Sequence, residues 1–218
     1  MARYLIKKQI TGVGLPAGYK RLEYIEATNN QYINTGIKLA STDVVMTKFQ
    51  NVSTTGGLYG VYKLGESSTF YSSGTYYFYD GTNTRINTGV SVNTDWHEVV
   101  HDFVNGKLTF DGTDHTFTPW TFENTSNSPL FARIYNGNAG YFFNGRIAYW
   151  KVYRNGTLIM DLVPCINTNN EVGMYDTVAG VFHGSRSASS FTAGPEVTEI
   201  RRYCVAFYGI RFVIHKEV

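Results

Sequence analysis

The most informative part of this chain is Gly18-Tyr-Lys-Arg-Leu-Glu-Tyr-Ile-Glu-Ala-Thr-Asn-Asn-Gln-Tyr-Ile-Asn-Thr-Gly-Ile37, because it opens a series of short motifs that follow in order. Its end, Tyr32 to Ile37, is rich in the aromatic and β-branched residues that favour strands. The later motifs are Phe143-Asn-Gly-Arg-Ile147, Lys151-Val-Tyr-Arg-Asn-Gly-Thr-Leu158, Asp161-Leu-Val-Pro-Cys165, Glu171-Val-Gly-Met-Tyr-Asp176 and Phe191-Thr-Ala-Gly-Pro-Glu196.

The rest of the chain also has the composition of strands and turns. Asn-Gly and Asp-Gly pairs favour tight hairpins with positive φ, and therefore antiparallel pairing. Such pairs are Asp80-Gly81, Asn105-Gly106, Asp111-Gly112, Asn144-Gly145 and Asn155-Gly156. Further strands are expected over Val44 to Phe49, Gly57 to Lys63, Thr75 to Tyr79, Trp96 to Phe103, Lys107 to Phe110, Leu130 to Tyr135, Gly140 to Arg154, Thr157 to Pro164 and Val181 to Phe182. No amphipathic helix of ten or more residues is expected, although a short helical turn would fit near Asn167 to Glu171.

In this order, the motifs resemble the concanavalin A-like, laminin-G-type jelly-roll domains of bacteriophage virion proteins and of surface proteins of gut bacteria. The resemblance covers roughly residues 15 to 196. It implies an all-β fold, an antiparallel jelly-roll β-sandwich with short N- and C-terminal strand extensions. It says less about function, because one scaffold hosts many different sites.

The segments outside the resemblance suggest a domain organisation of three parts. Residues 1–14 form a basic N-terminal arm, residues 15–196 the jelly-roll domain, and residues 197–218 a C-terminal strand extension with Gly209 as a break. Either both ends add edge strands to the sandwich, or they dock the domain onto a neighbouring chain. We favour docking, and the candidate docking residues are Tyr4, Ile6, Phe207, Ile210 and Phe212.

Composition narrows the classes of partner. Hydrophobic residues make up 43% of the 218 residues and charged residues 17%, which predicts a globular chain. The net charge of +2 argues against nucleic acid as the main partner. The sequence contains no run of about 18 apolar residues, so no membrane span is predicted. The N-terminus also has no apolar core of the kind found in signal peptides. A surface-type fold without an export signal suits a virion protein that is assembled in the host cytoplasm.

The two cysteines, Cys165 and Cys204, do not form a CxxC pair or a metal-ligand pattern. They would either form a disulfide or pack as small apolar residues with free thiols. We favour free thiols.

His97-Glu98-Val99-Val100-His101 matches the HExxH pattern of zinc proteases, which requires a helix. Here the segment is predicted to be a strand, on which the two histidines would lie about 13 Å apart at roughly 3.3 Å per residue. The geometry therefore argues against a shared zinc ion. The sequence also lacks the Glu-x-Asp-x-x-Glu pattern of glucanases with a similar fold, so no catalytic residues are predicted.

No cofactor is predicted, although calcium stays an alternative. Laminin-G-type domains often hold calcium at a loop rim, and the candidate ligands are Asp80, Asp111, Asp114 and Asp176. Each of these aspartates also suits a turn, which is the interpretation we favour.

Two aromatic segments have the composition of a glycan site, which needs rings for stacking and polar groups for the sugar hydroxyls. The first segment contains Tyr71, Tyr77 and Tyr79, and the second contains Trp120, Tyr135, Asn136 and Asn138. The alternative is that the tyrosines pack on a half-exposed sheet.

These observations predict a non-catalytic bacteriophage virion structural protein, such as a capsid decoration, head fibre or tail module. It would belong to a homo- or hetero-oligomeric assembly, contact other virion proteins through its termini and adhere to cell-surface or mucosal glycans. The alternatives are a carbohydrate-binding module or adhesin on a bacterial cell surface and, third, a divergent glycoside hydrolase.

Overall fold

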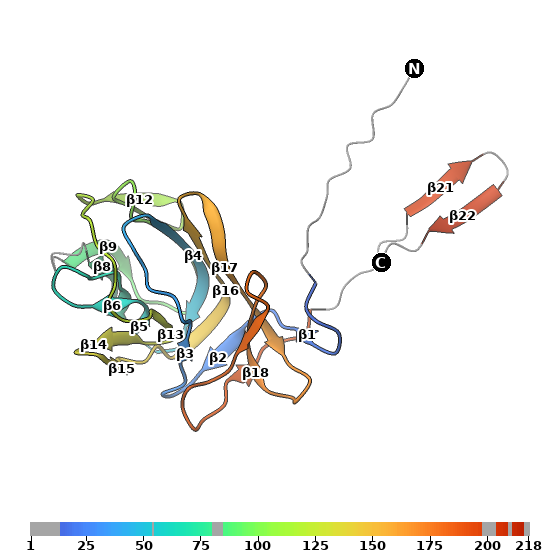
Figure 1. Cartoon of the computed structure of the whole chain (residues 1–218), viewed down its shortest axis with the longest axis horizontal. Coiled ribbons are helices and arrows are strands. Elements are labelled where there is room, and N and C mark those ends of the chain that lie inside the picture. The colour runs from blue at the N-terminus through green and yellow to red at the C-terminus, as the bar shows by residue number, and fades with distance from the viewer. Residues whose placement is uncertain (1–13, 54, 80–84, 198–203, 209–210, 216–218) are drawn as a thin grey trace, which may run out of the picture.

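The computed structural model describes residues 14–53, 55–79, 85–197, 204–208 and 211–215, the last two segments by their backbone. The chain forms a sandwich of antiparallel sheets, a large sheet packed against a small one (Figure 1). No helix occurs in these described ranges, and none therefore could cross a bilayer there. The predicted all-β, antiparallel sandwich is confirmed.

The large sheet contains the longest strands. Its spatial order is β12 (Thr113–Thr116), β11 (Lys107–Phe110), β10 (Trp96–Asp102), β4 (Asp43–Asn51), β16 (Gly145–Arg154), β17 (Thr157–Ile166), β18 (Val172–Asp176) and β19 (Val181–His183). The short strand β1 (Lys20–Arg21) pairs with β17, and β2 (Ile25–Ala27) pairs with both β16 and β20 (Thr192–Ala193). Segments from both ends of the domain thus meet in this sheet.

The small sheet covers the inner face of the large one. Its order is β3 (Ile33–Asn34), β13 (Pro129–Leu130), β5 (Thr55–Tyr59), β7 (Phe70–Ser73), β8 (Thr75–Tyr79) and β9 (Arg85–Ser91). A third sheet joins β6 (Val61–Tyr62), β14 (Arg133–Tyr135) and β15 (Asn138–Gly140), with β6 and β14 parallel. Strands β21 (Cys204–Tyr208) and β22 (Arg211–His215) pair with each other.

The core lies between the large and small sheets, and strand alternation explains how it is filled. In β4, Val45 and Phe49 are buried while Lys48 is exposed, and in β8, Tyr76 and Phe78 face the core. Successive side chains in a strand point to opposite faces, so one face of each strand supplies the core. Fully buried aromatic rings, including that of Trp150, fill most of the space between the sheets.

The Asn-Gly and Asp-Gly pairs show where the turn predictions succeeded. Asp111-Gly112 and Asn155-Gly156 have positive φ at both residues and close the β11–β12 and β16–β17 hairpins. Asn144-Gly145 was wrongly predicted as a hairpin turn, because Gly145 is the first residue of β16. A Cβ atom on Gly145 would lie 2.3 Å from the Gln50 carbonyl oxygen, so glycine is needed there for close strand packing.

Most predicted strands appear, but several are split or shortened. The expected strands over Gly57 to Lys63 and Leu130 to Tyr135 are each divided in two, and Asn167 to Glu171 forms a turn without a helix. Gly60, at the first of these breaks, has φ +105, a backbone conformation that L side chains rarely adopt. The predicted pair of strands in the C-terminal extension is confirmed as β21 and β22.

Candidate functional site

The outer face of the small sheet carries a group of tyrosines. Along β7 and β8, Phe70, Tyr76 and Phe78 point into the core, so that Tyr71, Tyr77 and Tyr79 point outward. The rings of Tyr71 and Tyr77 lie 5.1 Å apart and those of Tyr77 and Tyr79 5.8 Å apart, measured between centroids. Tyr71 and Tyr77 are nevertheless buried, because other segments of the chain cover them.

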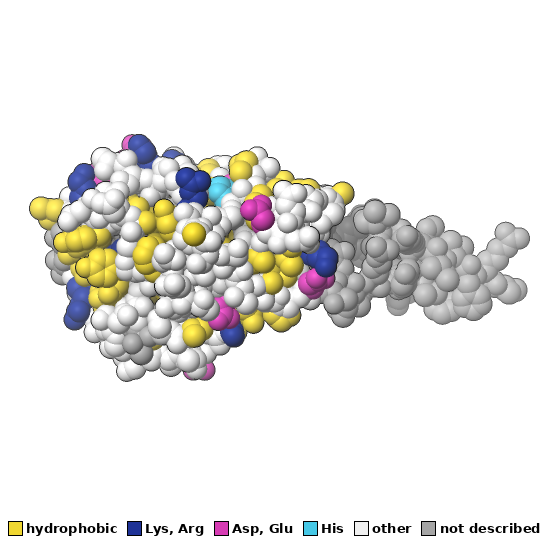
Figure 2. Space-filling model, turned by 90° about the horizontal axis from the view of Figure 1, so that it is seen from below, with side chains coloured by type: hydrophobic (Ala, Val, Ile, Leu, Met, Phe, Trp, Pro, Cys, Tyr) yellow, Lys and Arg dark blue, Asp and Glu magenta, His cyan; other side chains and the backbone are white. Residues whose placement is uncertain are grey.

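Strands β6 and β14 and the Tyr141 loop supply the covering side chains. Tyr62 lies 4.6 Å from Tyr79 and 5.7 Å from Tyr135, and Tyr141 lies 6.2 Å from Tyr71 and 5.9 Å from Tyr135. We call the following set the tyrosine–arginine cluster: Tyr62, Tyr71, Tyr77, Tyr79, Tyr135, Tyr141, Arg85 and Arg133. Figure 2 shows hydrophobic side chains gathered at the end of the molecule where β6, β14 and β15 lie.

Arg133 occupies the centre of this cluster. Its guanidinium carbon lies 3.9 Å from the ring centroid of Tyr141, 4.5 Å from that of Tyr71 and 4.8 Å from that of Tyr62. The Tyr135 ring is 5.9 Å away. A cation over several aromatic faces is attracted by each ring quadrupole, so Arg133 draws tyrosines from four different segments together.

The guanidinium of Arg133 is buried, and no described carboxylate pairs with it. The residue is 6% exposed, and its Nε and Nη1 atoms have no hydrogen-bond partner. Among the described residues, neither Arg133 nor Arg85 forms an ion pair with a carboxylate. Arg85 instead stacks on Tyr77 at 4.6 Å. A buried cation held by ring faces is costly, and a carboxylate or sulfate group would complete its hydrogen bonding.

Two glycines of β5 make room for the cluster. A Cβ atom on Gly57 would lie 2.9 Å from the Cβ atom of Arg133, and one on Gly56 would lie 2.6 Å from the carbonyl oxygen of Phe142. The Gly57 amide also donates a 2.6 Å hydrogen bond to the Tyr141 carbonyl. The arginine stem and the Tyr141 loop therefore lie directly on the backbone of the small sheet.

The cluster presents two rings to solvent. Tyr135 is 40% exposed and Tyr141 is 50% exposed, whereas the rings beneath them are buried or half-buried. Burial raises the pKa of Tyr77 to about 12, so its phenol stays protonated at neutral pH. The result is an uncharged aromatic surface with positive charge below it, which can stack on the apolar face of a sugar.

The structure brings together four of the predicted glycan residues, places Trp120 apart from them, and places Asn136 and Asn138 in the turn beside Tyr135. Tyr71, Tyr77, Tyr79 and Tyr135 belong to the cluster. Trp120 instead stacks on Phe122 at 4.8 Å and contacts Phe103, at the margin of the core. We therefore do not include Trp120 in the site.

Asn136 and Asn138 serve the β14–β15 turn. Asn136 has φ +49 and Gly137 φ +78, which makes Asn136-Gly137 a tight hairpin turn. The Asn138 side chain donates to the Asn136 carbonyl at 3.2 Å and lines a separate hollow of about 380 Å³ beside Tyr32. Neither asparagine makes a described contact with a cluster ring.

Sequence reasoning missed Arg133, Arg85, Tyr62 and Tyr141. Tyr62 and Tyr141 are single tyrosines in otherwise ordinary segments, and no local pattern marks them. A signal for Arg133 does exist, since an arginine inside the apolar run Leu130 to Tyr135 is an unusual residue for a buried strand.

The HExxH residues lie on strand β10, as predicted, with both imidazoles facing the core. His97 pairs through Nδ1 with Asp111 at 2.6 Å and through Nε2 with the Asn93 amide oxygen at 3.0 Å. His101 Nδ1 lies 3.0 Å from the Tyr59 hydroxyl. Burial lowers the pKa of His101 to about 3, so this imidazole is neutral.

The aspartates considered for calcium have local partners where the structure describes them. Asp111 accepts from the Glu98 amide, Asp114 from Lys107 and Thr109, and Asp176 from the Asp161 and Val178 amides. No group of three or more metal-ligating side chains occurs among the described residues. Asp80 lies outside the described residues.

The proposed docking residues are not tested by the structure. Tyr4, Ile6 and Ile210 lie outside the described residues, and Phe207 and Phe212 are described only as backbone partners in the β21–β22 pair. Cys165 is a free, buried thiol, and burial raises its pKa to about 12. The side chain of Cys204 lies outside the description.

Comparison with known proteins adds one likeness. No family model matches the chain, and no curated protein matches it. Among solved structures, a mouse laminin α1 chain with domains LG4-5 is similar, with 13% identity, a TM-score of 0.46, and coverage of 88% of this chain and 51% of the laminin chain. This chain thus spans about half the length of that structure, and the likeness concerns the fold alone.

The class of protein follows from the sheets themselves. The chain is a sandwich of antiparallel β-sheets.

Proposed function

We propose that this chain is a non-catalytic adhesion module of a bacteriophage virion, which binds glycans at the tyrosine–arginine cluster. The observation that carries the binding proposal is the buried Arg133 guanidinium, which lies among four tyrosine rings and has two unpartnered nitrogens. Buried polar groups are normally paired, and the exceptions often serve a function. A ligand would supply the missing partner.

The cluster has the two chemistries that a glycan requires. The exposed rings of Tyr135 and Tyr141 provide a stacking surface for the apolar face of a pyranose. Arg133 holds the rings in place and, with Arg85, gives the site a positive charge. We therefore propose that the preferred glycans carry a carboxylate or a sulfate group. Reaching the Arg133 nitrogens requires the Tyr141 ring to move aside, a small side-chain change of a kind common on binding.

The virion assignment is supported by the ordered sequence motifs between Gly18 and Glu196, which resemble those of phage virion domains. Many copies on one particle would convert weak single contacts into firm attachment through effective concentration. The alternative with the same binding chemistry is an adhesin on a bacterial cell surface. Antibody labelling of purified phage particles separates the two, because an adhesin would be absent from them.

The binding proposal is tested by titrating the protein against a panel of acidic and neutral oligosaccharides. Replacing both Tyr135 and Tyr141 by alanine should weaken the binding of acidic glycans about tenfold or more, as two stacking contacts are lost. Arg133→Met should remove the preference for acidic over neutral glycans. Tyr153→Ala and Arg21→Met, which change the same residue types outside the cluster, are the matched controls.

Equal binding by wild type and the double tyrosine variant would refute the site. Release of reducing sugars from any polysaccharide in the panel would instead favour the third alternative, a divergent glycoside hydrolase.

A further inference from the structure

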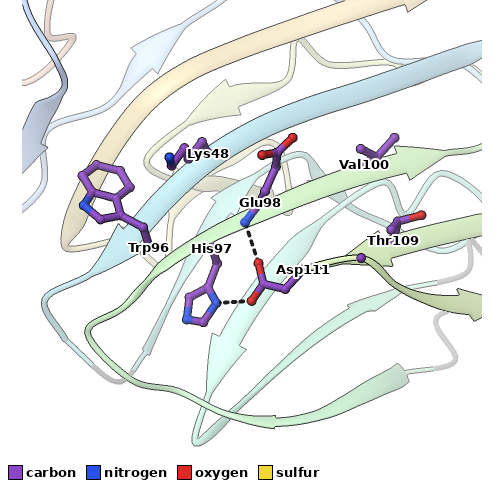
Figure 3. A pocket seen from close by; sticks show the side chains of 8 residues that line it. Lys48, Trp96, His97, Glu98, Val100, Thr109 and Asp111 are labelled. Carbon is purple, nitrogen blue, oxygen red and sulfur yellow. Dashed lines mark hydrogen bonds and ion pairs between the residues drawn. The ribbon is translucent and has the colours of Figure 1, made fainter.

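A hollow lies on the outer face of the large sheet, and Figure 3 shows the side chains that line it. It measures about 510 Å³ and is lined by Lys48, Trp96, Glu98, Val100 and Thr109, together with the Asp111 turn. A smaller hollow of about 210 Å³ shares Lys48 and Trp96 and continues to Tyr24, Glu23 and Ala148. We call the two together the Trp96 groove. None of its residues belongs to the tyrosine–arginine cluster.

The register of the sheet builds this groove. Trp96, Glu98 and Val100 alternate with the buried His97 and Val99 along β10 and so face outward. Lys48 of β4 lies directly opposite Glu98 on one side and Tyr149 of β16 on the other. The groove therefore runs across the strands, from Thr109 on β11 to Tyr24 beside β2.

An irregularity in β16 widens the groove floor. The pairing of β16 with β4 shifts between Ile147 and Tyr149, so Ile147 and Trp150 both face the core although they are three residues apart. Ala148 and Tyr149 consequently both lie on the outer side. The small Ala148 lies in the floor of the second hollow.

The lining combines an aromatic platform with one cation, Lys48, and the carboxylates of Glu23, Glu98 and Asp111. The Trp96 ring is 37% exposed, lies 5.7 Å from the Tyr24 ring and has the Lys48 ammonium 5.8 Å from its centroid. Glu98 faces Lys48, and burial together with a hydrogen bond to Glu98 raises the pKa of Tyr149. Lys48 thus has a carboxylate opposite it in the sheet register, which Arg133 lacks among the described residues.

A clamp beneath the strand holds the platform in place. Asp111 accepts from the Glu98 amide at 2.8 Å and pairs with His97 at 2.6 Å, and Figure 3 shows both interactions below the groove residues. The backbone between Trp96 and Glu98 is therefore fixed from the β11–β12 turn. A preorganised platform loses less conformational entropy when it binds a ligand.

We propose that the Trp96 groove is a second binding site, and that its ligand is an uncharged polysaccharide. A sugar ring would stack on Trp96, while Glu98, Lys48 and Thr109 exchange hydrogen bonds with hydroxyl groups. The backbone groups of β4 and β10 are already paired within the sheet, so an extended peptide cannot bind here by strand addition. With three carboxylates and one lysine, the lining disfavours an acidic chain.

The test uses the whole chain and measures affinity for soluble β-glucan, mannan, xylan and starch, with the acidic glycans of the first site as a parallel series. Trp96→Ala should weaken the binding of the neutral polysaccharide about tenfold or more and leave acidic glycan binding within about twofold of wild type. Glu98→Gln, which keeps the shape of the side chain, should weaken neutral binding less. The Tyr135→Ala, Tyr141→Ala double variant should instead lose affinity for acidic glycans and keep its affinity for the neutral polysaccharide.

The two sites fail independently in this design. The second site is refuted if no neutral polysaccharide binds the wild type, or if Trp96→Ala and Glu98→Gln bind as the wild type does. In that case, a loss of acidic glycan binding in the Tyr135→Ala, Tyr141→Ala variant would still support the first site. Melting temperatures of the variants confirm that each one is folded.

Discussion

The tyrosine–arginine cluster and the Trp96 groove present aromatic rings on opposite sheets, but their cations differ in burial and in whether a carboxylate lies opposite them. In the cluster, Arg133 is 6% exposed and lies among ring faces without an acidic partner in the described chain. In the groove, Lys48 remains in solvent and faces Glu98 across the strand pair. The rings of the cluster come from loops and short strands, whereas Trp96 belongs to a long central strand.

This difference is the basis of the two specificities that we propose. A cation that is desolvated and unpaired favours an anionic partner, because pairing recovers part of the cost of its burial. A cation that already faces a carboxylate contributes hydrogen bonds without net charge. The same aromatic chemistry would therefore select acidic glycans on one side of the molecule and neutral ones on the other.

The largest effect is expected where the cluster rests on the sheet. Gly57→Ala places a Cβ atom 2.9 Å from the Cβ atom and 3.1 Å from the backbone nitrogen of Arg133. We expect a loss of roughly 3 kcal/mol in the free energy of unfolding, together with weaker acidic glycan binding. Urea denaturation measures the first and titration the second. Gly140→Ala is the control, because nothing lies within 4 Å of its Cβ position.

A contrary result would be a Gly57→Ala protein as stable as the Gly140→Ala protein. The Trp96 groove should keep its affinity for neutral polysaccharide in both, which would show that the two sites respond separately to a local change.

Acid should destabilise the fold that carries both sites. The unfolded chain protonates His101 near pH 6.5, whereas burial keeps this imidazole neutral in the folded state down to about pH 3. The unfolded state therefore binds more protons between these values, and the free energy of unfolding falls as the pH drops below 6.5. The limiting slope is about 1.4 kcal/mol per pH unit, or on the order of 2 kcal/mol between pH 6.5 and 5.

His101→Gln provides the comparison for this effect, because glutamine can still bond the Tyr59 hydroxyl but does not titrate. Urea denaturation at pH 7, 6 and 5 should show a shallower pH dependence in the variant. Equal slopes in the two proteins would show that His101 does not control acid stability.

A smaller effect is expected at the clamp below the groove. Asp111→Asn keeps an acceptor for the Glu98 amide and tolerates the φ of +47, but weakens the pairing with His97. We expect a loss of about 1 kcal/mol in thermal or urea unfolding, with the cluster unaffected. Asp114→Asn removes an exposed pairing on the next strand and should change stability little. Identical behaviour of the two variants would argue against a clamp.

The smallest effect is expected at Asn138, which sequence composition assigns to a glycan site. Its side chain bonds the carbonyl of its own turn at 3.2 Å. Asn138→Ala should therefore leave acidic glycan affinity within about twofold of wild type, because no ring contact changes. A loss comparable with that of the Tyr135→Ala, Tyr141→Ala variant would extend the site to the β14–β15 turn.

The fold was accessible from sequence because its signals are local. Strand β8 matches the predicted Thr75 to Tyr79, and the Asp111-Gly112 and Asn155-Gly156 turns are where positive φ was expected. Turn chemistry and alternation act over a few residues, so they can be recognised without tertiary information. Asn144-Gly145 shows the limit, because the same dipeptide serves there to admit the Gln50 carbonyl.

The sites were only partly accessible, because they depend on contacts between distant segments. Composition made Tyr71, Tyr77 and Tyr79 candidate glycan residues. Arg133 and Tyr141 join them only through the parallel pairing of β6 with β14 and the hydrogen bond from the Gly57 amide to the Tyr141 carbonyl. Trp96 was recognised as part of a strand, while its exposure depends on the register of β10 against β4. A register between distant strands has no local signature.

The bulge in β16 also gives a way to sort related sequences by residue count. Four residues separate Gly145 from Trp150, and the extra one turns both Ala148 and Tyr149 outward. A homologue with one residue fewer in this interval would alternate strictly and lose that widened floor, while the tyrosines on the opposite sheet would be untouched. The number of residues between the positions of Gly145 and Trp150 would then predict, from sequence alone, which related proteins keep the widened floor of the Trp96 groove.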